Sequence, residues 1–285
     1  MSKEIVLKLS CPDEPGIAAL VLTFFAKNGY NITESSQHED PYNQTFFMRT
    51  VFSYSEETSD LADLKKAFGD IVEHLNMTWE MRDTKDKLRI LIAVSNWGHC
   101  LSKLLTTWHR GQLPVEIVGI VSNHESLREI ADWYKIPYHY FPITKETKPQ
   151  QEKQILDCMM DNNAECLILA RYMQILSDDM CKKLAGNAIN IHHSFLPGFK
   201  GAKPYHQAYD RGVKLIGATA HYVTSDLDEG PIIEQGVDRI THANSPEELV
   251  EIGRDIETVV LNRAVRWHAE GRVLLNGKRT VVFRR

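Results

Sequence analysis

Residues 88–94 read Leu-Arg-Ile-Leu-Ile-Ala-Val, a nearly continuous apolar run that contrasts with the alternating segment Glu4–Ser10. A strand that is apolar throughout is buried on both faces, which is typical of a parallel sheet covered by helices. Similar runs follow at Val115–Val121 and Cys166–Leu169. Helical patterns lie between them at His99–Arg110, Glu125–Tyr134 and Gln150–Asn162. The stretch at 88–94 therefore predicts an α/β fold with a doubly wound, mostly parallel, Rossmann-like sheet.

The same domain continues to the C-terminus with a different pattern. Leu215–Ile240 is strand-like on both sides of an Asp-Glu-Gly-Pro turn, which predicts antiparallel strands added to the sheet. Pro246–Arg266 is amphipathic, and Ser245 with Glu248 three residues later forms a capping box at its start. We therefore expect one domain over residues 88–285.

The residues before this domain have the order of predicted strands and helices that is typical of a ferredoxin-like module. Strand patterns at 4–10, 30–38, 45–54 and 77–82 and helical patterns at 17–28 and 61–75 give the order β-α-β-β-α-β. Thr84-Lys-Asp-Lys87 is charged and lacks core residues, so it is the expected domain boundary. We therefore expect a separate domain over residues 1–84.

Composition excludes several classes of protein. The 285 residues are 43% hydrophobic and 25% charged, and the net charge of −5 argues against a nucleic-acid or membrane-surface partner. We find no apolar run of membrane-spanning length and no signal-peptide pattern at the start. The 5 cysteines are scattered without a Cys-x-x-Cys pair, which indicates free thiols in a reducing compartment, the cytoplasm.

The segment Asn190-Ile-His192 carries the first candidate chemistry. In an extended strand, residues two apart point to the same face, so the amide and the imidazole lie together. The strand Ala188–His192 also ends there, and ligands of open α/β sheets bind beyond the carboxyl ends of strands. An amide can hold a carbonyl oxygen while an imidazole moves a proton. The alternative is that Asn190 caps a turn and His192 is a hydrogen-bonded core histidine.

A second candidate stretch, Asp226-Leu-Asp228-Glu-Gly-Pro, places several carboxylates at one turn. A carboxylate near His192 would orient its ring, although turn formation alone also explains these residues. Between the two stretches, Pro197 forces a sharp turn, and the sequence leaves the isomer of the Leu196–Pro197 bond open.

Taken together, these residues resemble a known family. The matching positions are Asn190-Ile-His192, Ser194-x-Leu-Pro197, Gly201, His221-x-Val-x-x-x-Leu-Asp228-x-Gly-Pro and Gln235. In this order and spacing they resemble the formyltransferase family that uses 10-formyltetrahydrofolate, over nearly all of residues 88–285. The resemblance implies that Asn190, His192 and Asp228 are catalytic. Asn190 would hold the formyl oxygen, His192 would relay a proton, and Asp228 would orient His192.

The resemblance also implies a folate-binding wall and no metal or redox cofactor. The expected contacts are Arg171, Tyr172, Met173, Gln174, Leu176, His193 and Val223. His193 stands where related transferases carry proline, and we expect it beside the reacting groups rather than as the catalyst. Lys203 either contacts the folate tail or is solvated, and the sequence leaves both open.

The loop after residue 94 departs from the glycinamide ribonucleotide formyltransferases, which carry a glycine- and serine-rich loop that cradles the substrate phosphate. Here the residues are Ser95-Asn-Trp-Gly-His-Cys-Leu101, and Trp97 and His99 are bulky. If no amine acceptor binds, water must attack the formyl group, which makes the enzyme a hydrolase. The alternatives are a formyltransferase acting on an amine and a non-catalytic, amino-acid-responsive folate-binding protein.

The turn Cys11-Pro-Asp-Glu-Pro-Gly16-Ile17 resembles the ACT family, which implies a small amino-acid effector near Asp13, Gly16 and Ile17. The plain alternative is a ferredoxin-like module without a ligand. An ACT-like domain ahead of a formyltransferase-like domain is similar to the family of formyltetrahydrofolate deformylases. That resemblance implies release of tetrahydrofolate and formate, balance of the one-carbon pool, formate for purine synthesis, and a homo-oligomer, dimer or tetramer. Metabolic reasoning suggests glycine or methionine as effector.

Overall fold

The computed structural model describes residues 3–54, 60–198 and 204–284, and these divide into two compact units. The first unit comprises Met1–Lys87, Trp267–Asn276 and Thr280–Arg285, and the second comprises Leu88–Arg266 and Gly277–Arg279. Our expectation placed all of 88–285 in the second domain, so the structure differs from it at the C-terminus. Across the described parts of the chain, the helices are too short or too polar to cross a membrane.

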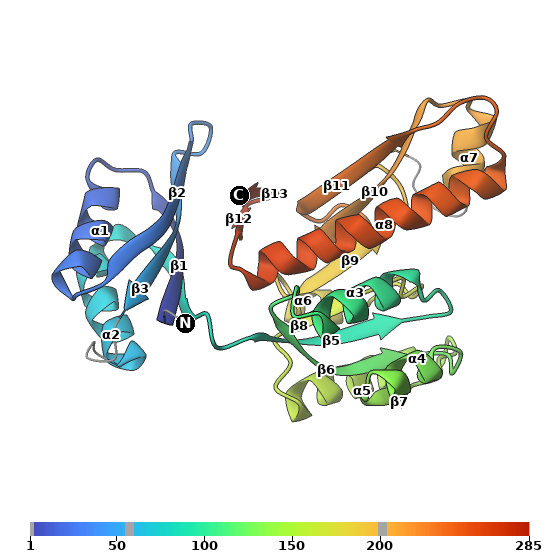
Figure 1. Cartoon of the computed structure of the whole chain (residues 1–285), viewed down its shortest axis with the longest axis horizontal. Coiled ribbons are helices and arrows are strands. Elements are labelled where there is room, and N and C mark those ends of the chain that lie inside the picture. Colours follow the sequence, from blue (N-terminus) through green and yellow to red (C-terminus); the bar gives the residue numbers. More distant parts are fainter. Residues whose placement is uncertain (1–2, 55–59, 199–203, 285) are drawn as a thin grey trace. The chain divides into compact units, whose positions relative to one another are not determined.

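In the first unit, a four-stranded antiparallel sheet has the order β2-β3-β1-β4, and two helices connect its strands (Figure 1). The elements are β1 (Lys3–Pro12), α1 (Ile17–Lys27), β2 (Asn31–Asp40), β3 (Thr45–Tyr54), α2 (Leu61–Val72), the 3₁₀ turn η1 (Glu73–Leu75) and β4 (Thr78–Asp83). Phe25 of α1 stacks on Phe52 of β3 at 3.8 Å between ring centroids, and Phe68 of α2 packs against Phe25. The predicted β-α-β-β-α-β order is confirmed.

The C-terminal hairpin explains why the end of the chain belongs to the first unit. Its strands are β12 (Val273–Asn276) and β13 (Arg279–Val282). Leu274 and Phe283 pack with Phe47, so β3 is buried on both faces from Phe46 to Phe52. Arg272 is 1% exposed, and its Nη1 donates to Glu34 Oε1 at 2.8 Å. This hairpin was not predicted from the sequence, and the C-terminal domain boundary differs from the predicted one because of it.

The second unit has a seven-stranded sheet in the order β11-β10-β9-β8-β5-β6-β7. Its strands are β5 (Leu88–Val94), β6 (Val115–Ser122), β7 (Tyr138–Tyr140), β8 (Cys166–Leu169), β9 (Ala188–His192), β10 (Leu215–Tyr222) and β11 (Ile232–Arg239). The strands from β5 to β9 pair in parallel, whereas β10 and β11 are antiparallel. The predicted mostly parallel sheet with antiparallel additions is confirmed.

Six helices with described bounds accompany this sheet (Figure 1): α3 (His99–His109), α4 (Arg128–Trp133), α5 (Lys148–Asp161), α6 (Asp178–Lys183), α7 (Pro204–Asp210) and α8 (Pro246–Ala269). The short α6 and α7 were not predicted. The capping box of α8 is present, because Ser245 N donates to Glu248 Oε2 at 2.8 Å and Glu248 N donates to Ser245 Oγ at 3.3 Å.

The carboxyl ends of β5, β8 and β9 lie along one edge of the sheet because these strands are parallel neighbours. The loop after each strand therefore begins at the same edge. Ser95, just after β5, contacts the loops after β6 and β8: its Oγ donates to Asn123 Oδ1 at 2.7 Å and accepts from Met173 N at 3.1 Å. This edge is where the candidate site forms.

Candidate active site

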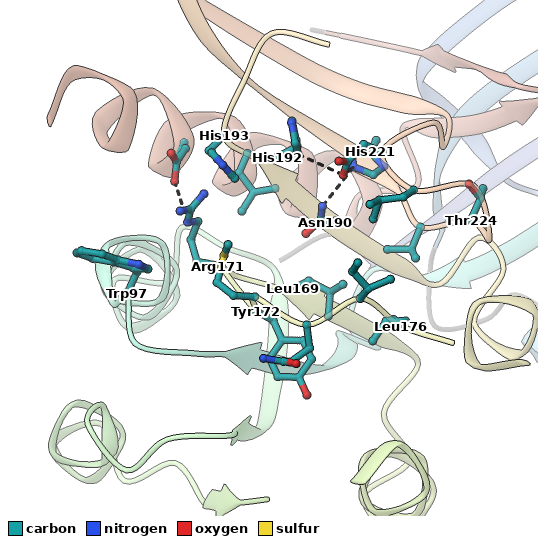
Figure 2. A pocket seen from close by; sticks show the side chains of 18 of the residues that line it. Trp97, Leu169, Arg171, Tyr172, Leu176, Asn190, His192, His193, His221 and Thr224 are labelled. Atoms are coloured by element: carbon teal, nitrogen blue, oxygen red, sulfur yellow. Dashed lines mark hydrogen bonds and ion pairs between the residues drawn. The ribbon is translucent and has the colours of Figure 1, made fainter. Parts of the chain in front are cut away.

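A pocket of about 530 Å³ opens at this edge of the second unit (Figure 2). Every residue predicted for catalysis or folate binding lines it: Asn190, His192, Asp228, Arg171, Tyr172, Met173, Gln174, Leu176, His193 and Val223. The lining also includes Trp97, Tyr205 and His221, together with Val250, Arg254 and Glu257 from α8. The fold thus brings together polar residues that lie far apart in the sequence, such as the ion pair between Arg171 and Glu257, which are 86 positions apart.

Strand pairing fixes the polar centre of the pocket. Asn190 and His192 are two residues apart on β9, and the antiparallel register places His221 of β10 directly opposite Asn190. Cross-strand neighbours on one face have close side chains. Accordingly, Asn190 Nδ2 lies 3.3 Å from His221 Nε2.

The hydrogen bonds of His221 define the orientation of the Asn190 amide. His221 Nδ1 lies 2.9 Å from the carbonyl oxygen of Tyr222 and must donate, because a carbonyl only accepts. Burial lowers the pKa of His221, which favours the neutral ring. Its Nε2 is then an acceptor for one N–H of Asn190. The second N–H of that amide is left for a ligand.

Asp228 reaches His192 from the turn between β10 and β11. Its Oδ1 lies 3.2 Å from His192 Nδ1 and 3.9 Å from His221 Nε2. Burial opposes ionisation of Asp228, but the hydrogen bond and charge of His192 outweigh it and lower the pKa. Gly230 permits this turn, because a Cβ there would lie 1.7 Å from the carbonyl oxygen of Tyr222.

Only one ring nitrogen of His192, Nε2, is available to a ligand. Its Nε2 is buried and has no hydrogen-bond partner among the described residues. A buried polar atom without a partner is costly unless a ligand uses it. With Nδ1 held by Asp228, Nε2 is the atom of this ring that can exchange a proton with a substrate.

One end of the pocket is aromatic and charged. Arg254 lies over the Trp97 ring, 4.3 Å from its centroid. Glu257, 1% exposed, accepts from Tyr205 Oη at 2.9 Å and lies 2.7 Å from His99 Nε2. Burial opposes ionisation of Glu257, but His99 and Arg171 outweigh it and lower its pKa.

Arg254, Glu257 and Tyr205 were not predicted from the sequence. Glu257 had a usable signal: it lies four residues after Gly253 and four before Leu261, both on the buried stripe of α8. A charged residue within an apolar stripe needs a partner, which is a hint of function.

His193, which follows the catalytic candidate, lines the charged end of the pocket. Its ring centroid lies 5.0 Å from that of His192 and 6.3 Å from that of Tyr205. Burial, followed by the charge of Arg171, lowers the pKa of His193 to about 4. The ring is therefore neutral at physiological pH.

His99, Cys100 and Glu257 bring three potential metal-binding atoms within 4.8 Å of one another. This set suits a divalent ion poorly. Burial raises the pKa of the Cys100 thiol well above its ordinary value, and Glu257 already faces Arg171. A metal needs the thiolate, whereas this environment favours the protonated thiol. The expectation that no metal takes part stays a prediction.

The remaining candidates lie elsewhere or outside the described residues. Asp13, Gly16 and Ile17 belong to the first unit, where Gly16 precedes α1 and Ile17 is buried. Gly201 and Lys203 lie outside the described residues. The Leu196–Pro197 bond, which the sequence left open, is cis.

Comparisons with known proteins match both units. Residues 88–265 match the formyl transferase family and residues 5–73 match the ACT domain family. A formyltetrahydrofolate deformylase of Corynebacterium sp. (strain P-1) is 48% identical over 100% of both chains. The crystal structure of a formyltetrahydrofolate deformylase from Burkholderia mallei superimposes with a TM-score of 0.95, at 49% identity, over 99% of this chain and 100% of that one. The glycinamide ribonucleotide transformylase 1 of Symbiobacterium toebii is more distant, with a TM-score of 0.65 and 26% identity over 70% of this chain and 95% of that one.

Proposed function

The chain belongs to the formyltetrahydrofolate deformylase family, and on this premise we infer that it hydrolyses 10-formyltetrahydrofolate to tetrahydrofolate and formate. The observation that supports the chemistry best is the state of His192. Its Nδ1 is held by Asp228 and its Nε2 is buried without a partner among the described residues, beside the amide of Asn190.

We propose that the formyl oxygen binds the free N–H of Asn190. Water then adds to the formyl carbon: its oxygen forms the new C–O bond, the carbonyl π electrons move onto the formyl oxygen, and one water proton passes to His192 Nε2. A donor aimed at the oxygen that gains charge stabilises the transition state more than the ground state. The buried position of the pocket centre strengthens this effect.

In the second step the intermediate collapses and the C–N10 bond breaks. The bonding electrons stay on N10, which takes the proton from His192 Nε2. The products are tetrahydrofolate and formic acid, which ionises in water. Asp228 serves both steps, because its carboxylate stabilises the imidazolium that exists between them. His221 holds the Asn190 amide in place throughout.

The two ends of the pocket differ in their side chains, and this difference supports one orientation of the bound substrate. Leu176 and Thr224 lie at one end and Trp97 at the other, with Asn190 and His192 between them (Figure 2). Val223 packs against the hydrophobic cluster that contains Leu176. An apolar slot suits a flat heterocycle. We therefore place the pterin against Leu176 and Val223, which leaves the Trp97 end for the attacking group.

Water is the attacking group that this end favours. Arg254 lies over the Trp97 ring, and His99 is held by Glu257, so both the loop after β5 and the first residue of α3 carry bulky side chains that already have partners. A phosphate-bearing amine needs open backbone N–H groups in such a loop. The alternative of a formyltransferase acting on an amine is therefore not favoured, in keeping with the distant relation to the transformylase of Symbiobacterium toebii.

The first unit supports a proposal about regulation. The match to the ACT domain family favours an amino-acid effector near Asp13, Gly16 and Ile17, and we propose glycine or methionine on metabolic grounds. We further propose a cytoplasmic homo-oligomer that balances the one-carbon pool and supplies formate for purine synthesis. No bound cofactor enters this scheme, because folate is the substrate.

An assay of formate release tests the proposed function. The purified protein, given 10-formyltetrahydrofolate alone, should produce formate and tetrahydrofolate in equal amounts. Glycinamide ribonucleotide should not be required. If formylated amine forms and formate does not, the transferase alternative replaces hydrolysis. Repeating the assay with single amino acids tests the effector, since glycine or methionine should change the rate.

A further inference from the structure

Arg171 has donors that the fold leaves unused. Its Nε and Nη1 are buried and have no hydrogen-bond partner among the described residues. Nε lies 3.4 Å from Glu257 Oε2, an ion pair without the geometry of a hydrogen bond. The side chain is 12% exposed and lines the pocket. A guanidinium with free N–H groups in a substrate pocket is typical of a site for a planar anion.

The backbone at Arg171 also indicates that this side chain has a role. Its φ is 66°, in the left-handed region that glycine adopts freely and that side chains other than Asn and Asp disfavour. Residues held in this region cluster at functional sites, where the surrounding structure maintains them. Glycine would relax the backbone here but would leave no guanidinium.

Glu257 is a positioning residue for Arg171. Its two carboxylate oxygens are held by Tyr205 and His99, so the charge opposite Arg171 is fixed. Gly253 makes room for Tyr205, because a Cβ there would lie 2.1 Å from the Tyr205 ring. The guanidinium is thus fixed on one side and free on the other.

Arg171 lies at the end of the pocket where the attacking oxygen enters. Figure 2 shows its side chain between Trp97 and His193, at the opposite end from Leu176 and Thr224. The other cations at this end are less available: Arg254 lies over Trp97, and His193 is neutral at physiological pH. Arg171 is therefore the cation best placed to meet a new negative charge.

Hydrolysis creates such a charge. The formyl group of the substrate is a neutral amide, whereas the formic acid formed from it gives its remaining proton to water and becomes a carboxylate that carries the oxygen taken from water. We propose that the free guanidinium edge of Arg171 binds this carboxylate, so that the Trp97 end of the pocket is a formate subsite. The inference rests on the hydrolysis proposed above. It assigns Arg171 to the one-carbon product rather than to the folate.

Arg171→Gln tests the subsite. Because the guanidinium contacts the group that gains charge, kcat should fall about 10- to 100-fold while KM for 10-formyltetrahydrofolate changes little. Inhibition by added sodium formate should weaken at least about tenfold, since the product loses a charge-assisted bond. A raised KM with unchanged kcat and unchanged formate inhibition would overturn the proposal, because it would assign Arg171 to folate binding.

Two further Arg171 variants separate function from folding. Arg171→Lys keeps the charge and should retain more formate inhibition than Arg171→Gln. Arg171→Gly relaxes the positive φ, so it should stay folded and still lose formate inhibition. Lys135→Gly is a matched control, because Lys135 also has a positive φ (57°) and does not line the pocket. It should leave kcat and formate inhibition unchanged.

A binding measurement gives a readout besides activity. Excess sodium formate, compared with sodium chloride at the same ionic strength, should raise the melting temperature of the wild type and not that of Arg171→Gln. An equal rise in both proteins would overturn the subsite. The wild-type assay distinguishes the two proposals: if the wild type releases no formate, hydrolysis fails, whereas formate release with formate inhibition that persists in Arg171→Gln refutes the subsite alone.

Discussion

At the scale of single residues, Asp228 and Arg171 share a left-handed backbone, with φ of 58° and 66°. Such a conformation costs an ordinary residue about 1 kcal/mol, and less for aspartate, whose short side chain tolerates it. Both residues project into the pocket from loops that follow strands. The backbone strain and the candidate chemistry therefore coincide, as is common at functional sites.

Asp228→Asn should abolish most turnover while leaving the fold intact. Asparagine keeps the shape and also tolerates a positive φ, but it cannot stabilise a charged His192. We expect kcat to fall about 100- to 10,000-fold with little change in melting temperature. Asp226→Asn, in the same turn and away from the pocket lining, is the control and should keep normal turnover. Near-normal kcat in Asp228→Asn would remove Asp228 from the mechanism.

The sequence allowed part of this site to be predicted. Strand periodicity is enough to put Asn190 and His192 on one face, and the family motif points to Asp228. Arg254 and Glu257 could not be assigned to the site from the sequence. A helical pattern identifies the buried face of α8 but not the strands against which that face packs. The unpaired N–H groups of Arg171 could not be predicted either, because a sequence alone gives neither the backbone φ nor the hydrogen-bond partners of a side chain.

At the scale of elements, β3 and the C-terminal hairpin show how a distant segment completes a sheet. Consecutive buried residues in β3 require cover on both faces, and β12–β13 supplies the second cover. Asn276-Gly277 lies between two short apolar runs, which is a strong hairpin signal that we overlooked. The longer strands were predicted well because their burial on one or both faces sets a clear period.

Arg272→Ala should destabilise the first unit. Arg272 is buried, donates to Glu34 through Nη1 and Nη2, and also binds the carbonyl of Phe283. Its loss leaves Glu34 without its main partner, at a cost of about 3 kcal/mol, the low end for a broken buried pair because Glu34 is partly exposed. Urea unfolding measures the change. Lys278→Ala, exposed at the hairpin turn, should cost almost nothing, and an equal loss in both variants would contradict this account.

At the scale of the whole molecule, two families meet in one chain, an ACT domain and a formyl transferase domain. The order of elements in each domain could be predicted because strands and helices have different periods of apolar residues. The assignment of Trp267–Asn276 and Thr280–Arg285 to the first unit could not, because it depends on contacts between segments more than 200 residues apart, such as the pair Arg272–Glu34 at 238.

Acid should destabilise the protein in two steps. The pKa of His193 is lowered to about 4, so the unfolded chain binds a proton at this site near pH 6.5 and the folded chain does not. The free energy of unfolding therefore falls as pH drops from about 6.5 to 4, by on the order of 3 kcal/mol for this group. Asp228 and Glu257 have lowered pKa values, so their contribution is lost at still lower pH.

Melting temperature measured against pH tests this dependence. His193→Gln should reduce the slope between pH 6.5 and 4 without abolishing it, because burial also lowers the pKa values of His221 and His268. The drop below pH 4 should stay in place. A curve that is unchanged by the substitution would contradict a contribution of His193 to the upper step.

The origin of the oxygen in the released formate tests the central claim most directly. In ¹⁸O-labelled water, with no amine present, hydrolysis at the Asn190–His192–Asp228 centre forms one new C–O bond from water. Mass spectrometry of formate from a single turnover should then show one ¹⁸O atom in each molecule. Unlabelled formate, or formate that appears only after an amine acceptor is added, would contradict direct attack by water.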